Sequence, residues 1–168
     1  HLLSLINDVL DMSRIESGKM GLREEKESLA DIIHSIKSIV QPDVAEKNLA
    51  LCIDVVNVKN ERVICDKLRI KQILLNIVSN SVKYTYQGGK IQVTVRQKTV
   101  SPSGYATYEF RIEDNGMGMG KDYIDKIFEP FTREKSVTVS GIQGTGLGMS
   151  ITKNIVDMMG GSIEVESE

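Results

Sequence analysis

The sequence predicts an α+β fold, a two-layer sandwich in which helices cover one face of a sheet. Some segments place apolar residues at helical spacing, and others alternate apolar and polar residues as half-buried strands do. Helices and strands follow one another without the regular alternation of a parallel α/β protein. These observations together favour the α+β class.

The first predicted helix covers residues 1–17, where apolar residues form a wide stripe. Ser17 and Gly18 end it. A stripe this wide on a single helix predicts a partner helix. The chain begins at His1 with neither Met nor a signal-like region, so we expect a piece of a longer protein. Residues 1–18 then form one part and residues 19–168 another.

Capping residues and a proline indicate where the next helices begin and end. Ser28 and Asp66 are expected to cap two helices, and Pro42 to interrupt the first of these near its end. The other predicted elements are strands at 20–23, 49–56 and 62–65, a hairpin at 90–99 and 105–113, a short helix at 121–127, a mobile loop at 132–143, a helix at 145–159 and a last strand at 162–166.

Composition excludes several functions. The chain is 40% hydrophobic with a net charge of −2, and it lacks Trp, which argues against nucleic-acid binding. No apolar run approaches the roughly 20 residues of a membrane span, so we expect no direct membrane contact. Cys52 and Cys65 lie in apolar runs without a CxxC pattern. We expect two buried thiols and a cytoplasmic location.

The helix predicted after Asp66 carries a narrow polar stripe. Asn76, Asn80 and Lys83 recur at intervals of four and three residues, and with Gln72 they lie within about 80° of the helix circumference. A solvated face is one interpretation, but such faces favour Glu, Lys and Ala over Asn. Amide and phosphate oxygens can share Mg²⁺, and a lysine can offset phosphate charge.

Two glycine motifs complete a candidate nucleotide site. In DNGMG (residues 114–118), a carboxylate can accept a hydrogen bond from an exocyclic amine while the glycines let backbone approach a flat base. A tight turn is the alternative. In GTGLG (residues 144–148), N–H groups at a helix start can bind phosphates, although the motif is neither a Walker A nor a Rossmann sequence. A simple connection is the alternative there.

The sequence FEPF at residues 128–131 lies between the glycine motifs. Its two rings are expected to anchor in the core and to fix the near end of the 132–143 segment. That segment could close over a nucleotide and exclude water. Arg133 and Lys135 could reach phosphates from it, with solvated charges as the alternative.

With these motifs in this order, the chain resembles the catalytic ATP-binding domain of two-component sensor histidine kinases, in the GHKL superfamily. The resemblance covers nearly all of residues 20–168. It implies the Bergerat ATP-binding fold with a mixed sheet, and ATP and Mg²⁺ as ligands. It also implies that the last strand of the domain is truncated.

The resemblance implies roles for individual residues. Asn80 would ligate Mg²⁺, and Asn76 and Lys83 would be the catalytic residues facing the phosphates. Tyr84 would line the pocket, and Asp114 would read the adenine amino group. The remaining nucleotide-binding residues that it implies are Gly116 and Gly118 beside the base, and Gly144, Thr145, Gly146, Leu147 and Gly148 at the lid hinge and its phosphate contacts.

Residues 1–18 resemble the second helix of the family's dimerisation and phosphotransfer hairpin. The family's phosphoacceptor histidine lies on the first helix and is followed directly by an acidic residue. Neither His1 nor His34 has that context. The implied partners are therefore ATP, an acceptor helix absent from this chain, a response-regulator receiver domain and, in the full-length protein, a second copy.

Two other functions stay open at this stage. ATP-hydrolysing members of the superfamily resemble this chain but carry a Glu where Asn76 stands, and an amide is a poor general base. Asn76 therefore favours phosphoryl transfer over hydrolysis. A non-catalytic docking module is the second alternative, and the four intact motifs argue against it.

Overall fold

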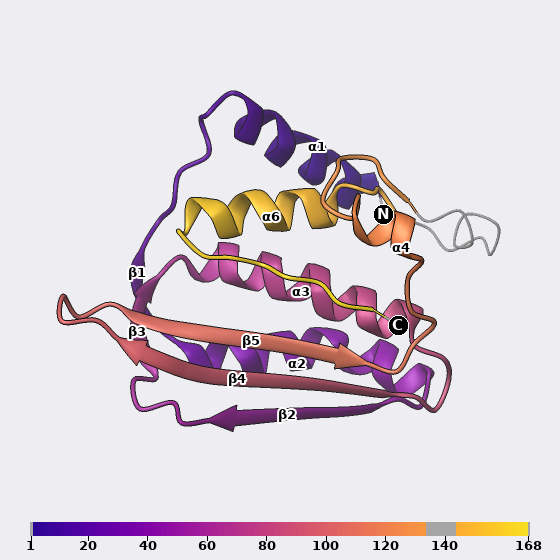
Figure 1. Ribbon diagram of the computed structural model, residues 1–168, viewed down its shortest axis with the longest axis horizontal. Helices are drawn as coiled ribbons and strands as arrows, with labels where there is room; N and C mark the ends of the chain where they lie inside the picture. The colour runs from indigo at the N-terminus through magenta and orange to yellow at the C-terminus, as the bar shows by residue number, and fades with distance from the viewer. Residues whose placement is uncertain (1, 134–143, 168) are drawn as a thin grey trace. The chain divides into compact units, whose positions relative to one another are not determined.

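The computed structural model describes residues 2–133 and 144–167 (Figure 1). The chain divides into two compact units, one formed by residues 1–23 and 118–168 and the other by residues 24–117. The elements in order are α1 (Leu2–Glu16), β1 (Glu25–Ser28), α2 (Leu29–Glu46), β2 (Ala50–Val56), β3 (Arg62–Cys65), α3 (Lys67–Tyr84), β4 (Lys90–Val100), β5 (Ala106–Asp114), α4 (Lys121–Ile124) and α6 (Gly148–Met158).

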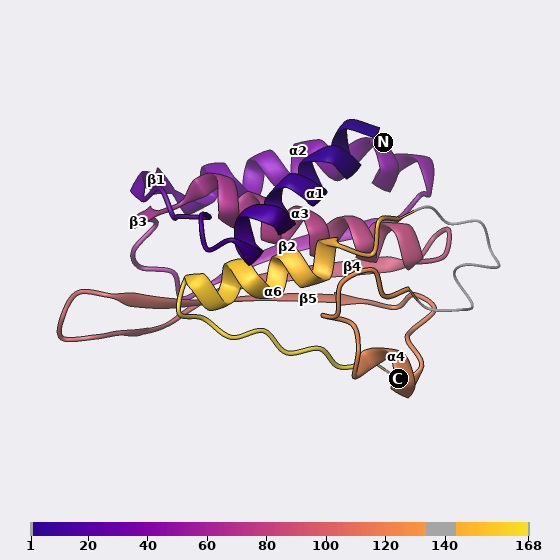
Figure 2. The ribbon, with the colours of Figure 1, turned by 90° about the horizontal axis from the view of Figure 1, so that it is seen from above.

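The unit of residues 24–117 is a mixed sheet covered by two helices. The sheet has the order β2-β4-β5, with β2 and β4 parallel and β4 and β5 antiparallel. Helices α2 and α3 lie side by side (Figure 2) and share one hydrophobic core with the sheet. Alternate residues of β4 point into that core, so Ile91, Val93 and Val95 are buried. The predicted α+β fold is confirmed.

Both helices of this unit begin at the predicted caps. The Ser28 hydroxyl accepts a hydrogen bond from the N–H of Asp31, and the Asp66 carboxylate accepts one from Arg69. Pro42 was expected to interrupt α2, but the helix continues to Glu46. The proline is exposed, and buried Val40 and Val44 on either side hold the last turn against the core.

A lysine caps the other end of α3. The Lys47 ammonium, from the end of α2, donates 2.8 Å hydrogen bonds to the carbonyls of Val82, Lys83 and Thr85. These carbonyls belong to the last turn and the cap of α3, where the helix lacks internal donors. A cation there also interacts favourably with the helix dipole. The end of α3 is therefore fixed by three charge-assisted bonds.

Three sequence predictions about strands and cysteines were wrong. The first strand is Glu25–Ser28 and not 20–23, because β3 offers a partner only there. Residues 162–166 form no strand, since alternation alone does not create one without a neighbouring strand to pair with. Cys52 is exposed on β2 and Cys65 is half-buried, so neither thiol is fully buried.

In the other unit, α1 packs along α6 (Figure 1). Gly18 ends α1 in the left-handed conformation, with φ of +65°. Much of the apolar surface of α1 remains exposed, between 40% and 71% for Leu3, Leu5, Ile6, Val9 and Leu10. Within the described part of the chain, no helix has the length and apolar character that crossing a bilayer requires.

Candidate functional site

The predicted polar stripe lies on α3 as expected. Asn76, Asn80 and Lys83 are half-buried, whereas Leu74 and Val78 on the same helix are buried in the core. The Lys83 ammonium lies 5.0 Å from the centroid of the Tyr84 ring, a cation–π distance. Because the core fixes the apolar side of α3, the amides are held at defined positions on the other side.

The DNGMG motif docks on the end of α3. The Tyr84 carbonyl accepts a 3.2 Å hydrogen bond from Met117, and Asp114 Oδ1 accepts a 3.0 Å bond from the N–H of Gly116. A Cβ on Gly116 would lie only 2.6 Å from the Tyr84 oxygen. Gly116 is therefore needed for this close approach, which brings the exposed Asp114 carboxylate beside the end of the asparagine helix.

Two residues at this junction were not among the predicted site residues. Asn115 extends the β4–β5 ladder, because its side-chain oxygen accepts from Lys90 N at 2.7 Å while its own N–H donates to Lys90 O. The Thr85 hydroxyl is buried and, among the described residues, is the one buried side-chain polar atom without a hydrogen-bond partner. No sequence pattern indicated the Asn115 bonds, since they depend on Lys90, which is 25 residues away in the chain.

The GTGLG motif precedes α6 in the other unit. The helix was predicted from Thr145 but begins at Gly148, because Gly146 adopts φ of +73°. The Gly146 carbonyl accepts a 3.0 Å bond from the N–H of Phe131. The Thr145 hydroxyl accepts a bond from Leu147 N at 3.2 Å and donates to Asp8 of α1 at 3.0 Å.

The other glycines and the FEPF turn are also placed. Gly118 has φ of +66°, and Gly144 is exposed at the edge of the described residues. The prediction that both FEPF rings anchor in the core was wrong for Phe131, which is 71% exposed with φ of +61°. The backbone of Phe131, and not its ring, links the FEPF turn to the GTGLG motif, because its N–H donates to the Gly146 carbonyl. Residues 134–143 and the Lys135 prediction lie outside the described residues.

The carboxyl of Asp8, on α1, has a shifted pKa. Burial raises the pKa of Asp8, the Thr145 hydrogen bond lowers it, and the charge of Asp11 raises it further. No described group of three or more His, Cys, Asp or Glu side chains could hold a metal. A Mg²⁺ ion would instead need amide and substrate oxygens, and half-buried Asn80 offers such an amide.

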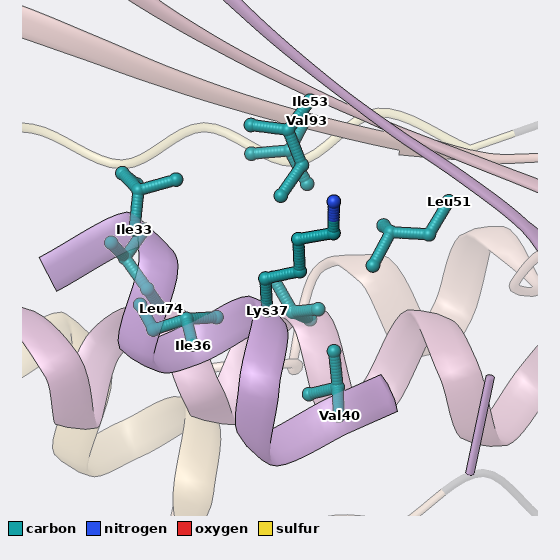
Figure 3. A pocket seen from close by; sticks show the side chains of 9 residues that line it. Ile33, Ile36, Lys37, Val40, Leu51, Ile53, Leu74 and Val93 are labelled. Carbon is teal, nitrogen blue, oxygen red and sulfur yellow. The ribbon is translucent and has the colours of Figure 1, made fainter. Parts of the chain in front are cut away.

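Two hollows in the described residues lie apart from these groups. A cavity of about 10 Å³ lies between α2, α3 and the sheet, where Lys37 extends toward Leu51 and Ile53 (Figure 3). Its lining is apolar and it is barely large enough for one water. A depression of about 460 Å³ is lined by residues of β4 and of the segment after β2, namely Asn57, Lys59, Gln97, Lys98 and Val100.

The candidate residues thus form two groups, one in each unit. In one, the α3 stripe lies in the same unit as the junction of Tyr84, Asp114 and Gly116. In the other, residues 144–148 are held by Asp8 and Phe131. The first group offers amides, a lysine and a carboxylate. The second offers glycine backbone at the start of an 11-residue helix.

Comparisons with known proteins agree with the motifs. The family model "Histidine kinase-, DNA gyrase B-, and HSP90-like ATPase" matches residues 65–168. The chain is 35% identical over its whole length to Autoinducer 2 sensor kinase/phosphatase LuxQ of Vibrio parahaemolyticus, of which it spans 20%. It is 40% identical to hybrid signal transduction histidine kinase B of Dictyostelium discoideum, also over its whole length, and spans 8% of that protein.

A solved structure is similar as well. Full-length ShkA in complex with AMPPNP superposes on 95% of this chain with a TM-score of 0.76 and 28% identity, and the match covers 31% of the ShkA chain. The chain therefore spans a fifth or less of the curated relatives named above and about a third of this structural neighbour.

Proposed function

This chain belongs to the histidine kinase-, DNA gyrase B-, and HSP90-like ATPase family, and from that premise we propose that it is the ATP-binding catalytic domain of a sensor histidine kinase. One observation carries the proposal. Gly116 seats the exposed Asp114 carboxylate against the end of α3, the helix that carries Asn76 and Asn80. A carboxylate beside glycine backbone suits a base, and amides suit the phosphate end.

In this proposal Asp114 accepts a hydrogen bond from the adenine amino group. Gly116 and Gly118 lie beside the base, and Tyr84 lines the pocket. The exposure of Asp114 supports its role, because a carboxylate that reads a ligand must be reachable. Residues 144–148 contribute backbone N–H groups to the phosphates at the start of α6. The AMPPNP in the ShkA complex agrees with a nucleotide ligand for this fold.

We further propose that Asn80 ligates a Mg²⁺ ion shared with the phosphate oxygens. Bound there, the ion would neutralise charge that develops during phosphoryl transfer. Lys83 offsets further phosphate charge one turn along the helix, and Asn76 faces the same groups. The donor set is one of oxygens with few carboxylates, which suits an ion that keeps several waters.

The reaction proposed is transfer of the γ-phosphate to a histidine. Because the transition state of phosphoryl transfer is loose, positioning and charge neutralisation suffice and no strong base is needed. Asn76 fits this chemistry better than water activation, since an amide accepts a proton poorly. The acceptor histidine lies on a helix outside these 168 residues, because neither His1 nor His34 has the family's acceptor context.

The partners proposed follow from the same family. Residues 1–18 belong to the dimerisation and phosphotransfer hairpin, and residues 19–168 form the catalytic domain. The exposed apolar face of α1 supports a partner helix, supplied by the acceptor helix and by a second copy of the full-length protein. A response-regulator receiver domain then takes the phosphoryl group. Two thiols without a disulfide agree with a cytoplasmic location.

Calorimetry with Mg-ATP tests the proposal. The parent should bind, and Asp114→Asn should weaken binding at least about 30-fold, because an amide presents an N–H where the carboxylate accepts. Glu113→Gln is the matched control, since it changes the adjacent exposed carboxylate. A parent that does not bind would favour a docking module. Steady ATP hydrolysis would favour an ATPase, and phosphate on His1 or His34 would contradict the external acceptor.

A further inference from the structure

A polar contact joins α1 to the glycine motif of residues 144–148. Asp8 Oδ2 accepts a 3.0 Å hydrogen bond from the Thr145 hydroxyl, across 137 residues of sequence. Both residues belong to the same compact unit, and α1 packs along α6, the helix that the motif begins. The two side chains are half-buried, so solvent competes only partly with the bond.

Thr145 links Asp8 to the backbone of the motif through a second hydrogen bond. Its oxygen also accepts a 3.2 Å hydrogen bond from the N–H of Leu147, the last residue before α6. A hydroxyl that donates to a carboxylate is fixed in rotation and becomes a stronger acceptor. Asp8 therefore holds the turn from Thr145 to Leu147, while Phe131 holds the carbonyl of Gly146 between them.

The placement of Asp8 is not explained by stability alone. Burial raises the pKa of this carboxyl, and the Thr145 bond opposes only part of that effect. The charge of Asp11, one turn further along α1, acts in the same unfavourable direction. A carboxylate in such a position costs folding free energy. What it gains is a single directional contact with the glycine motif.

We propose that Asp8 is a positioning residue for nucleotide binding, which by holding Thr145 keeps the glycine motif in its phosphate-binding form. This inference rests on the proposed function, because it requires that residues 144–148 contact phosphates. Linkage then makes the effect reciprocal: docking of α1 strengthens nucleotide binding, and nucleotide strengthens docking of α1. A displacement of α1 that breaks the contact loosens the hold on ATP.

Mg-ATP affinity of the whole 168-residue chain tests this coupling. Asp8→Ala and Thr145→Val should each weaken binding about five- to tenfold, and the double variant should weaken it no further, because both remove one contact. Asp8→Asn keeps an acceptor for the Thr145 hydroxyl and should stay within about twofold of the parent. Glu16→Gln, which changes an exposed carboxylate of the same helix, should leave the affinity unchanged.

A second measurement separates positioning from a general loss of folding. In the nucleotide-free chain, Asp8→Ala should speed hydrogen exchange at the Leu147 amide and leave the amide of buried Ile155 in α6 unchanged. A parent that binds Mg-ATP no better than Asp8→Ala would overturn this inference alone. Tighter binding by Asp8→Ala and Asp8→Asn would overturn it too, since the carboxylate would then repel phosphate. A parent without ATP binding would contradict the proposed function and this inference together.

Discussion

The two groups of candidate residues are held by different interactions. The α3 group stands on a helix whose apolar side, including Leu74 and Val78, is buried in a shared core. Asp66 caps the start of that helix and Lys47 caps its end. Residues 144–148, although Leu147 is buried, take their backbone conformation from a left-handed glycine and from single hydrogen bonds to Asp8 and Phe131.

The α3 group is therefore preformed, whereas residues 144–148 can be adjusted by neighbouring segments. Burial of several apolar side chains contributes many kcal/mol and resists local change. Single polar contacts contribute about 1 kcal/mol each and can be made or broken by a partner segment. The residues proposed to read the base, and the α3 side chains proposed to hold Mg²⁺ and offset phosphate charge, are therefore fixed by the fold. The backbone N–H groups of residues 144–148, also proposed to contact the phosphates, depend on segments such as α1.

Gly116→Ala should break the fixed group most severely. The added Cβ would lie 2.6 Å from the Tyr84 carbonyl oxygen and 2.8 Å from Asp114 Oδ1, so the motif must move away from α3. We expect a loss of about 2–4 kcal/mol in the free energy of unfolding, measured by denaturant titration, and loss of Mg-ATP binding. Gly21→Ala is the control, because a Cβ there meets nothing within 4 Å. Equal effects from both substitutions would contradict the steric argument.

Lys47→Met should have the next largest effect. It keeps the aliphatic stem but removes three charge-assisted bonds to the end of α3, at an expected cost of about 2–3 kcal/mol in unfolding free energy. Lys37→Met, within α2, changes an exposed lysine and should cost little. Urea titration of both variants makes the comparison. Similar midpoints for the two would show that the cap contributes nothing.

Gly146→Ala tests the adjustable group. Alanine at this position would have to adopt φ of +73°, which side chains disfavour, and its Cβ would lie 3.0 Å from the Phe131 backbone. We expect a stability loss of about 1–2 kcal/mol and weaker Mg-ATP binding. Gly160→Ala shares the strain, with φ of +69°, but has open space around it. It should cost less and leave binding intact, so calorimetry of the pair isolates the contact with Phe131.

Asp8→Asn should give the smallest change, and one that depends on pH. Burial raises the pKa of Asp8 above 3.8, so the folded chain binds this proton more tightly than the unfolded chain. The stability linked to that proton is complete below the unfolded pKa and is lost as pH rises through the folded pKa. The variant should therefore be more stable than the parent by about 0.5 kcal/mol or less at about pH 7, after solvent screening.

Thermal unfolding across pH measures this difference directly. The gap between Asp8→Asn and the parent should close as the pH falls to about 3, where the parent carboxyl is protonated in both states. Glu16→Gln provides the baseline for an exposed carboxylate of α1. A gap that widens toward low pH would mean that the ionised form of Asp8 stabilises the fold.

The sequence predicted most of the unit formed by residues 24–117, because its signals are local. Alternation located β4 and β5, and capping side chains located the starts of α2 and α3. Errors arose where tertiary packing decided. Pro42 remains inside α2 because Val40 and Val44 pack on the core, and residues 162–166 lack the partner that a strand requires.

The candidate site residues themselves could be predicted from the sequence, but the residues that hold them in place could not. The asparagine stripe and both glycine motifs could be read from spacing, and their placement on α3, after β5 and before α6 agrees with the structure. Lys47, Asn115 and Asp8 gave no sequence signal, because each acts on residues distant in the chain. The roles of the predicted residues toward ATP and Mg²⁺ remain predictions.

The parallel pairing of β2 with β4 constrains the order in which the strands of this unit can pair during folding. Strands β4 and β5 are joined by a short turn and can pair early, but β2 and β4 are separated by residues 57–89, which include β3 and α3. Closing so long a connection is entropically costly and slow. The asparagine helix lies within that connection. We therefore expect α3 to bury its apolar side, and so to fix the position of its polar stripe, only after β4 has paired with β2. This step comes late in the folding of the unit.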